Sequence, residues 1–143
     1  MLVESYVLRC CPEGARVDRL LVHFSQPRDV PLRWSFGNEE QDQVTVRRWK
    51  PGGRTAGDST PQEDVFEIAF RRPRSVPFEV RAARTLPFAA PVSVSLASLP
   101  EAARQDGTVA VGSTRRGAMK IETHGVTPVP PTPTKAAPVT ITY

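Results

Sequence analysis

The chain has 143 residues, of which 39% are hydrophobic, 24% are charged and only 7% are aromatic. This size and composition fit one globular domain that can bury a core without disulfide staples. Its 15 prolines are about twice the usual frequency, which excludes long helices and cuts the chain into short elements. No run of apolar residues is long enough for a membrane-spanning helix, and the start lacks the pattern of a signal peptide.

Short runs with apolar residues at every second position follow one another along the chain, separated by turn residues, and this pattern predicts strands. The expected strands are Val3–Arg9, Arg16–Phe24, Val30–Phe36, Gln43–Trp49, Val65–Phe70, Phe78–Arg84 and Pro91–Leu99, with two more at 108–113 and 118–125. The stretch between 50 and 64 has no pattern and reads as a surface loop. In the run before residue 100, the alternation places Val94 and Leu96 inward and Ser95 and Ala97 outward.

These runs predict an all-β protein, an antiparallel β-sandwich of about 8–10 short strands, with a barrel as the alternative. The expected sandwich domain covers residues 1–125. A proline-rich linker is expected at 126–138, because five of its thirteen residues are proline. The last run, 139–143, reads as a strand that is either the end of this domain or the start of another.

Arginine is concentrated between residues 71 and 88. The net charge is +4, and 16 of the 19 basic residues are arginine. Arg81 is expected to face water beside Glu79, because Phe78, Val80 and Ala82 occupy the opposite face of the predicted strand. A basic patch is a candidate phosphate site if the arginines of one turn converge with a more distant one; its members are Arg71, Arg72, Arg74 and Arg48. Nucleic acid is not an expected partner, because the aromatic residues lie on apolar faces.

The two tryptophans suggest a second candidate site. Trp34 shares its face with Val30, Leu32 and Phe36, which is typical of a core position. Trp49 lies opposite Val44 and Val46 in its run, so packing at an edge and exposure at the strand end both fit. An exposed tryptophan beside arginine is a feature of carbohydrate-binding modules. The candidate ligand-binding residues are Trp49, Arg47 and Arg33.

Catalytic and metal-binding patterns are not evident in the sequence. There is no pair of carboxylates at a defined spacing, no nucleophile elbow and no phosphate-binding loop. Two adjacent cysteines, Cys10 and Cys11, are poorly placed for a disulfide with each other, and they do not complete a zinc site with the distant His23 and His124. One thiol is expected to be buried and the other partly exposed. We therefore expect no enzyme, no cofactor and no metal.

Three phrases carry a resemblance to a known group of proteins: "VDRLLVHFSQPRDVPLRWSF", "FRRPRSVPFEVRAARTLPF" and "PVSVSLASLPEA". Together they resemble β-rich segments of the very large envelope-associated proteins of planctomycete bacteria. The resemblance implies an extracytoplasmic sandwich module of a longer chain. Its expected role is structural or adhesive, and its expected partners are other domains of that chain or envelope proteins. Carbohydrate binding is the alternative function, with a glycan as partner.

Overall fold

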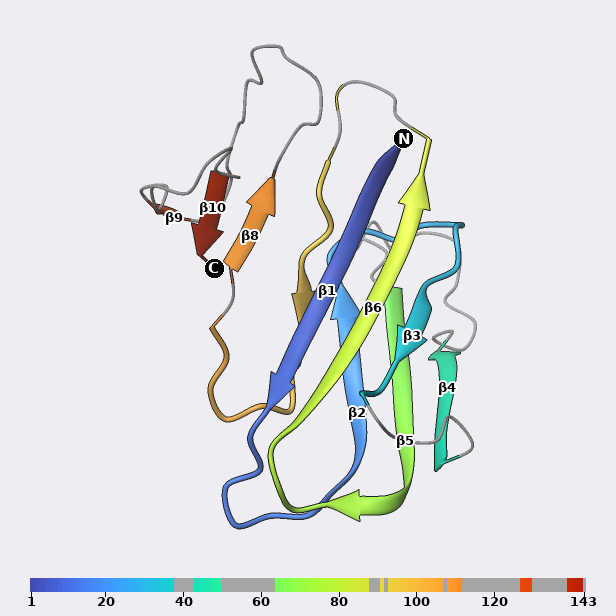
Figure 1. Cartoon of the computed structure of the whole chain (residues 1–143), viewed down its shortest axis with the longest axis vertical. Coiled ribbons are helices and arrows are strands. Elements are labelled where there is room, and N and C mark those ends of the chain that lie inside the picture. Colours follow the sequence, from blue (N-terminus) through green and yellow to red (C-terminus); the bar gives the residue numbers. More distant parts are fainter. Residues whose placement is uncertain are drawn as a thin grey trace, which may run out of the picture. The chain divides into compact units, whose positions relative to one another are not determined.

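A computed structural model describes residues 1–37, 43–49, 64–87, 91 and 93–106, together with the backbone of three later strands. The chain divides into two compact units, Met1–Ala102 and Ala103–Tyr143. The strands are β1 (Leu2–Cys10), β2 (Val17–Phe24), β3 (Arg33–Ser35), β4 (Val44–Trp49), β5 (Asp64–Arg74), β6 (Phe78–Leu86), β7 (Ala97–Ser98), β8 (Thr108–Val111), β9 (Thr127–Val129) and β10 (Val139–Thr142) (Figure 1).

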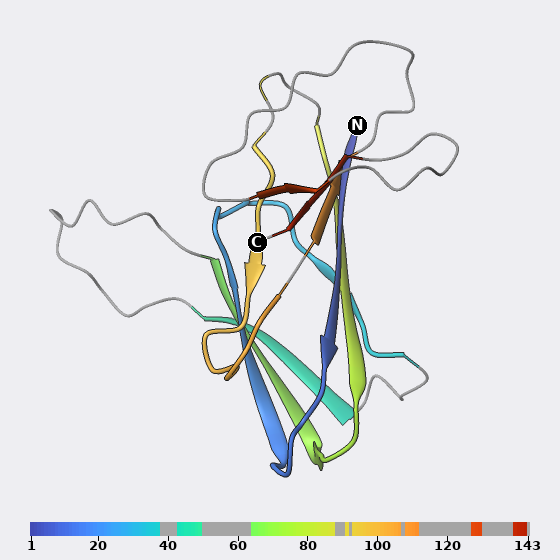
Figure 2. The same cartoon turned by 90° about the vertical axis from the view of Figure 1, so that its left-hand side faces the viewer.

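The first unit consists of two antiparallel sheets that pack face to face. One sheet has three strands in the order β1-β6-β3, and the other has four in the order β4-β5-β2-β7. Figure 2 shows them as two layers. The predicted β-sandwich is therefore confirmed. Strands β3 and β4 are edge strands of their respective sheets and lie on the same side of the sandwich (Figure 1).

Most connections in the first unit carry the chain from one sheet to the other. Between β1 and β7, only β4 and β5 are neighbours both in sequence and in a sheet. The crossing from β1 to β2 includes Gly14, at a φ of 71°, and the chain leaves β3 through Gly37, at a φ of 68°. This left-handed region is open to glycine at no steric cost, so both glycines suit the turns that redirect the chain.

The core lies between the two sheets and follows the alternation of the sequence. Phe66, Ile68 and Phe70 of β5 are buried, as are Val22 and Phe24 of β2. The Phe24 and Phe66 rings meet edge to face, with 5.7 Å between their centroids, a favoured arrangement for aromatic pairs. Burying such side chains stabilises a fold by about 1.5–3 kcal/mol each.

Two predicted strands are much shorter in the structure. The run Val30–Phe36 forms a strand only at Arg33–Ser35, and the run Pro91–Leu99 only at Ala97–Ser98. The predicted facing of the second run is wrong, because Ser95 and Ala97 are buried. The chain before Ala97 is irregular, so the strand period does not apply there. The Ser95 hydroxyl is satisfied by backbone: it accepts a hydrogen bond from the Gln26 N–H (3.3 Å).

The second unit contains a separate three-stranded sheet in the order β8-β10-β9. The last run of the sequence is thus a strand of this sheet, antiparallel to both neighbours. Within the proline-rich stretch, the described residues Thr127–Val129 form β9. The predicted strand at 118–125 and the predicted loop at 50–64, apart from Asp64 at the start of β5, lie outside the described residues. Nowhere in the described ranges does a helix have the length and apolar character needed to cross a membrane.

Candidate binding cleft between two edge strands

The predicted carbohydrate site is divided between the two sheets. Trp49 and Arg47 lie on β4, where they are opposite Val65 and Glu67 of β5 in register. The Trp49 side chain is 56% exposed. Arg33 lies on β3 in the other sheet, opposite Ala83 of β6. The fold therefore brings Trp49 and Arg47 onto one strand face but places Arg33 elsewhere.

The predicted basic patch does not converge around Arg48. Arg48 is opposite Phe66 in the β4–β5 ladder, whereas Arg71 lies five residues further along β5. At ~3.3 Å per residue this separates the two by about 17 Å. Arg71, Arg72 and Arg74 also lie within β5 and not in a turn after it, because the strand continues to residue 74. Arg71 and Arg72 are exposed.

A cleft opens between β3 and β4, on the side where both sheets end. Its volume is about 290 Å³. It is lined by Arg28, Asp29, Val30, Pro31, Leu32, Trp34, Val46, Arg48 and Phe66. Trp34 and Phe66 are the aromatic part of this lining, with 5.5 Å between their ring centroids. This volume lies near the lower end of the range for small-ligand pockets. The cleft therefore combines an apolar floor with charged groups at its rim.

Arg48 is held in place from two sides. Its Nε donates to Oδ1 of Asp64 at 2.6 Å, and its Nη2 donates to the backbone carbonyl of Arg28 at 3.2 Å. The guanidinium also lies over the Phe66 ring, 5.9 Å from the centroid. Asp64 is almost completely buried, so its charge is neutralised mainly by Arg48. Arg48 thus forms a fixed wall of the cleft.

Arg28 differs from Arg48 because its partners among the described residues are neutral. Its Nη2 donates to the Ser93 carbonyl at 2.6 Å and to Oε1 of Gln26 at 3.1 Å. Its Nε is buried and has no hydrogen-bond partner among the described residues. A buried donor that is left unpaired costs free energy. The Arg28 guanidinium therefore brings to the cleft lining a positive charge that no described carboxylate compensates.

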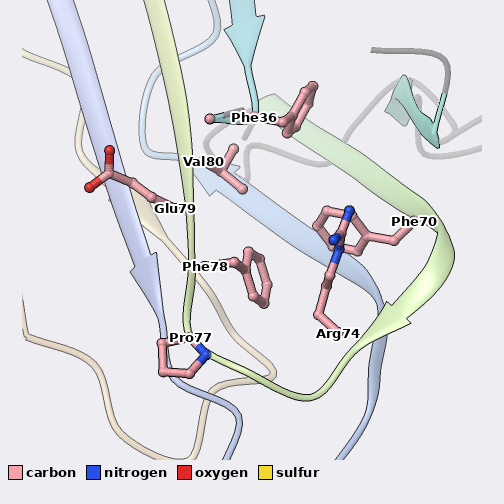
Figure 3. Close-up of a pocket in the computed structure, with 8 residues that line it drawn as sticks. Phe36, Phe70, Arg74, Pro77, Phe78, Glu79 and Val80 are labelled. Atoms are coloured by element: carbon pink, nitrogen blue, oxygen red, sulfur yellow. The ribbon is translucent and has the colours of Figure 1, made fainter. Parts of the chain in front are cut away.

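A second hollow of about 230 Å³ lies near the ends of β5 and β6 (Figure 3). Phe36, Phe70, Phe78 and Val80 give it an apolar lining, and the Arg74 guanidinium lies over the Phe70 ring at 5.3 Å. The Glu79 side chain points away from it. Glu79 instead pairs with Arg81 and Arg9 on the outer face, and these hydrogen bonds lower its pKa. The predicted outward position of Arg81 beside Glu79 is confirmed.

A buried ion pair connects the two neighbouring strands β1 and β6. Nε of Arg84 lies 2.5 Å from Oε2 of Glu4, and both side chains are almost completely buried. The Tyr6 hydroxyl donates to Glu4 and to the Ser95 carbonyl, at 3.1 Å each. Burial, followed by the charge of Glu4, raises the pKa of Tyr6 to about 12. The Arg84 guanidinium lies over the Phe24 ring at 5.8 Å.

Cys10 and Cys11 are both free, with Cys10 half-buried and Cys11 exposed. Burial, followed by the neighbouring Cys11, raises the pKa of Cys10 to about 11. His23 lies on β2, opposite Val65 and Ser98 in register, and His124 lies outside the described residues. Across the described ranges, no three His, Cys, Asp or Glu side chains gather as metal ligands would. No family model, curated protein or solved structure matches the chain.

Proposed function

We propose that the chain is a non-catalytic β-sandwich module that serves as a structural or adhesive unit of a larger envelope-associated bacterial protein. The observation that supports a binding role is the cleft between β3 and β4, where Arg28, whose described partners are neutral, lines the same space as Trp34 and Phe66. The placement of the buried carboxylates also favours a non-catalytic role, because Glu4 and Asp64 are each held by an arginine. The envelope context rests on the sequence resemblance.

Co-sedimentation with bacterial envelope fractions tests this proposal. The full chain is labelled at the exposed Cys11 and incubated with isolated sacculi and with outer-membrane vesicles. Saturable binding to one fraction is expected. Substitution in the cleft should weaken it, for example by Leu32→Trp, which fills the space with an indole. Binding that is unchanged by filling the cleft, or absent from both fractions, contradicts the proposal. Turnover of a substrate by the chain would also contradict it.

Carbohydrate binding through Trp49 is the second candidate function. It is favoured by the exposure of the Trp49 indole next to Arg47 on the same face of β4, because an exposed aromatic plane can stack on the C–H face of a sugar. A glycan array with the wild-type chain and with Trp49→Ala tests it. Loss of a glycan signal in the variant supports this site. A signal that Trp49→Ala leaves intact excludes Trp49 as the contact.

A further inference from the structure

The cleft lies beside the terminal strands of the two sheets, β3 and β4. β3 ends the three-stranded sheet and β4 ends the four-stranded sheet, and the cleft lining comes from both sides, including Trp34 of β3 and Val46 of β4. Within the described part of the chain, no strand pairs with the outer edge of β4. Unpaired N–H and C=O groups on an edge strand form a template for an additional strand. β4 is the longer of the two, with 6 residues against 3.

The direction of the side chains fixes what an added strand would present to the cleft. Successive side chains of a strand point to opposite faces. Every second side chain of a segment paired with β4 would therefore point inward, toward the floor made by Trp34 and Phe66. A floor of aromatic and aliphatic groups accepts an apolar anchor. A position two residues away lies on the same face and reaches the rim.

The rim determines the charge of the ligand. Arg48 already has a carboxylate partner in Asp64, whereas the described residues bonded to Arg28 supply only neutral acceptors. Asp29 also lines the rim, but no ion pair joins it to Arg28 in the described part of the structure. A ligand carboxylate at the rim would compensate the charge of the Arg28 guanidinium, since charge-assisted hydrogen bonds are the stronger class.

We propose that the cleft binds an extended acidic peptide segment of a neighbouring polypeptide, which adds a strand to the edge of β4. Its apolar side chain packs on Trp34 and Phe66, and its carboxylate, two residues away, pairs with Arg28. This inference rests on the proposed adhesive function and specifies the partner of the same cleft. The proposed recognition motif is therefore an apolar residue and an acidic residue two positions apart in the bound strand.

Trp34 can report binding directly. Trp34 and Trp49 are the two tryptophans of the chain, so Trp49→Phe in the full chain leaves Trp34 as the single indole reporter. The probe is the acetylated and amidated heptapeptide Ser-Glu-Thr-Leu-Thr-Val-Ser, together with its reversed sequence, because the direction of the added strand is to be determined. Three control peptides replace the Glu by Gln, replace the Leu by Ser, or move the Glu by one residue to the opposite face.

One of the two acidic peptides is expected to change the Trp34 emission saturably. Each control peptide should bind at least tenfold more weakly, because it lacks the charge, the anchor or the register. Added salt should weaken the binding of the acidic peptide more than the binding of the Gln peptide. Arg28→Gln should remove the preference for Glu over Gln, whereas the matched variant Arg47→Gln on the outward face of β4 should preserve it. Arg28→Gln should also be tolerated by the fold, because the described acceptors of Arg28 are neutral and its removal strands no described carboxylate.

The inference is overturned if neither acidic peptide binds, if Gln peptides bind as tightly, or if Arg28→Gln and Arg47→Gln behave alike. An oligogalacturonate that changes Trp34 emission while the peptides do not would also overturn it, in favour of an acidic glycan. None of these results decides the adhesive function, which is tested separately by the envelope co-sedimentation and its Leu32→Trp variant. Self-association of the chain that competes with the peptide would identify a second copy as the occupant, contrary to the proposal.

Discussion

Removing the buried charge of Arg84 should strongly destabilise the sandwich. Arg84→Met keeps an unbranched side chain between the sheets but leaves the Glu4 carboxylate buried with only the Tyr6 hydroxyl as a described donor. Breaking a buried pair in this way typically costs about 3–5 kcal/mol. The pair is itself imperfect, because Oε1 of Glu4 and both Nη atoms of Arg84 are buried without hydrogen-bond partners among the described residues. Replacing both partners by apolar side chains should therefore recover most of the loss.

Urea unfolding of a double-variant cycle tests this reasoning. The cycle comprises wild type, Glu4→Leu, Arg84→Met and the double variant. Arg81→Met is the matched control on the same strand. Its partner Glu79 is on the outer face, and exposed pairs contribute little to stability. The reasoning is refuted if Arg84→Met loses no more stability than Arg81→Met, or if the double variant is as unstable as the worse single one.

Three further predictions concern the core and its titrating groups. The pKa of Tyr6 is raised from 10.0 to about 12, so the fold favours the neutral phenol. The resulting contribution to the free energy of unfolding is complete below pH 10 and is lost as the pH rises through 12. Because Tyr6 is only half-buried, solvent screening reduces this contribution, and about 1 kcal/mol is expected in urea unfolding. Tyr6→Phe should not show the loss. Iodoacetamide at pH 8 should modify Cys11 long before Cys10, whose pKa of about 11 leaves about one thiol in a thousand ionised; equal rates contradict this. Ile68→Ala should cost about 3–4 kcal/mol, because Ile68 is fully buried; a loss below about 1 kcal/mol in urea unfolding contradicts this.

The alternation of the sequence predicted the sandwich and much of its core. Phe66, Ile68 and Phe70 share one parity in their run, and all three are buried. The same alternation indicates that Arg84 is buried, because it lies on the same face of its strand as Val80 and Ala82. The partner strand could not be predicted. Strand pairing depends on chain crossings between sheets, and the antiparallel register that places Glu4 opposite Arg84 links residues 80 positions apart.

The cleft was not predictable for a related reason. Trp34 was interpreted as a core residue from its parity, and its ring does pack on Phe24 and Phe66. Arg28 lies in the irregular connection between β2 and β3 and has no periodic signal. The two are brought together because the connection between β2 and β3, which carries Arg28, crosses from one sheet to the other, and Arg28 and Trp34 then line the same cleft. That crossing is a property of the topology, which local patterns do not encode.

The continuation of β5 through Pro73 has a physical explanation. A proline inside a strand cannot donate to the ladder, so the sequence "RRPR" indicated a turn. In the structure, Arg19 pairs with Ala69 and Val17 pairs with Arg74, and the register shifts between them. Pro73 falls within this irregularity, where no partner on β2 requires its missing N–H. Between these two pairs the chain moves five residues along β5 but only two along β2, so β5 contains extra residues. Such bulges bend a strand. The bend leads into the crossing to β6, so the proline that suggested the end of a strand lies where β5 turns toward the other sheet.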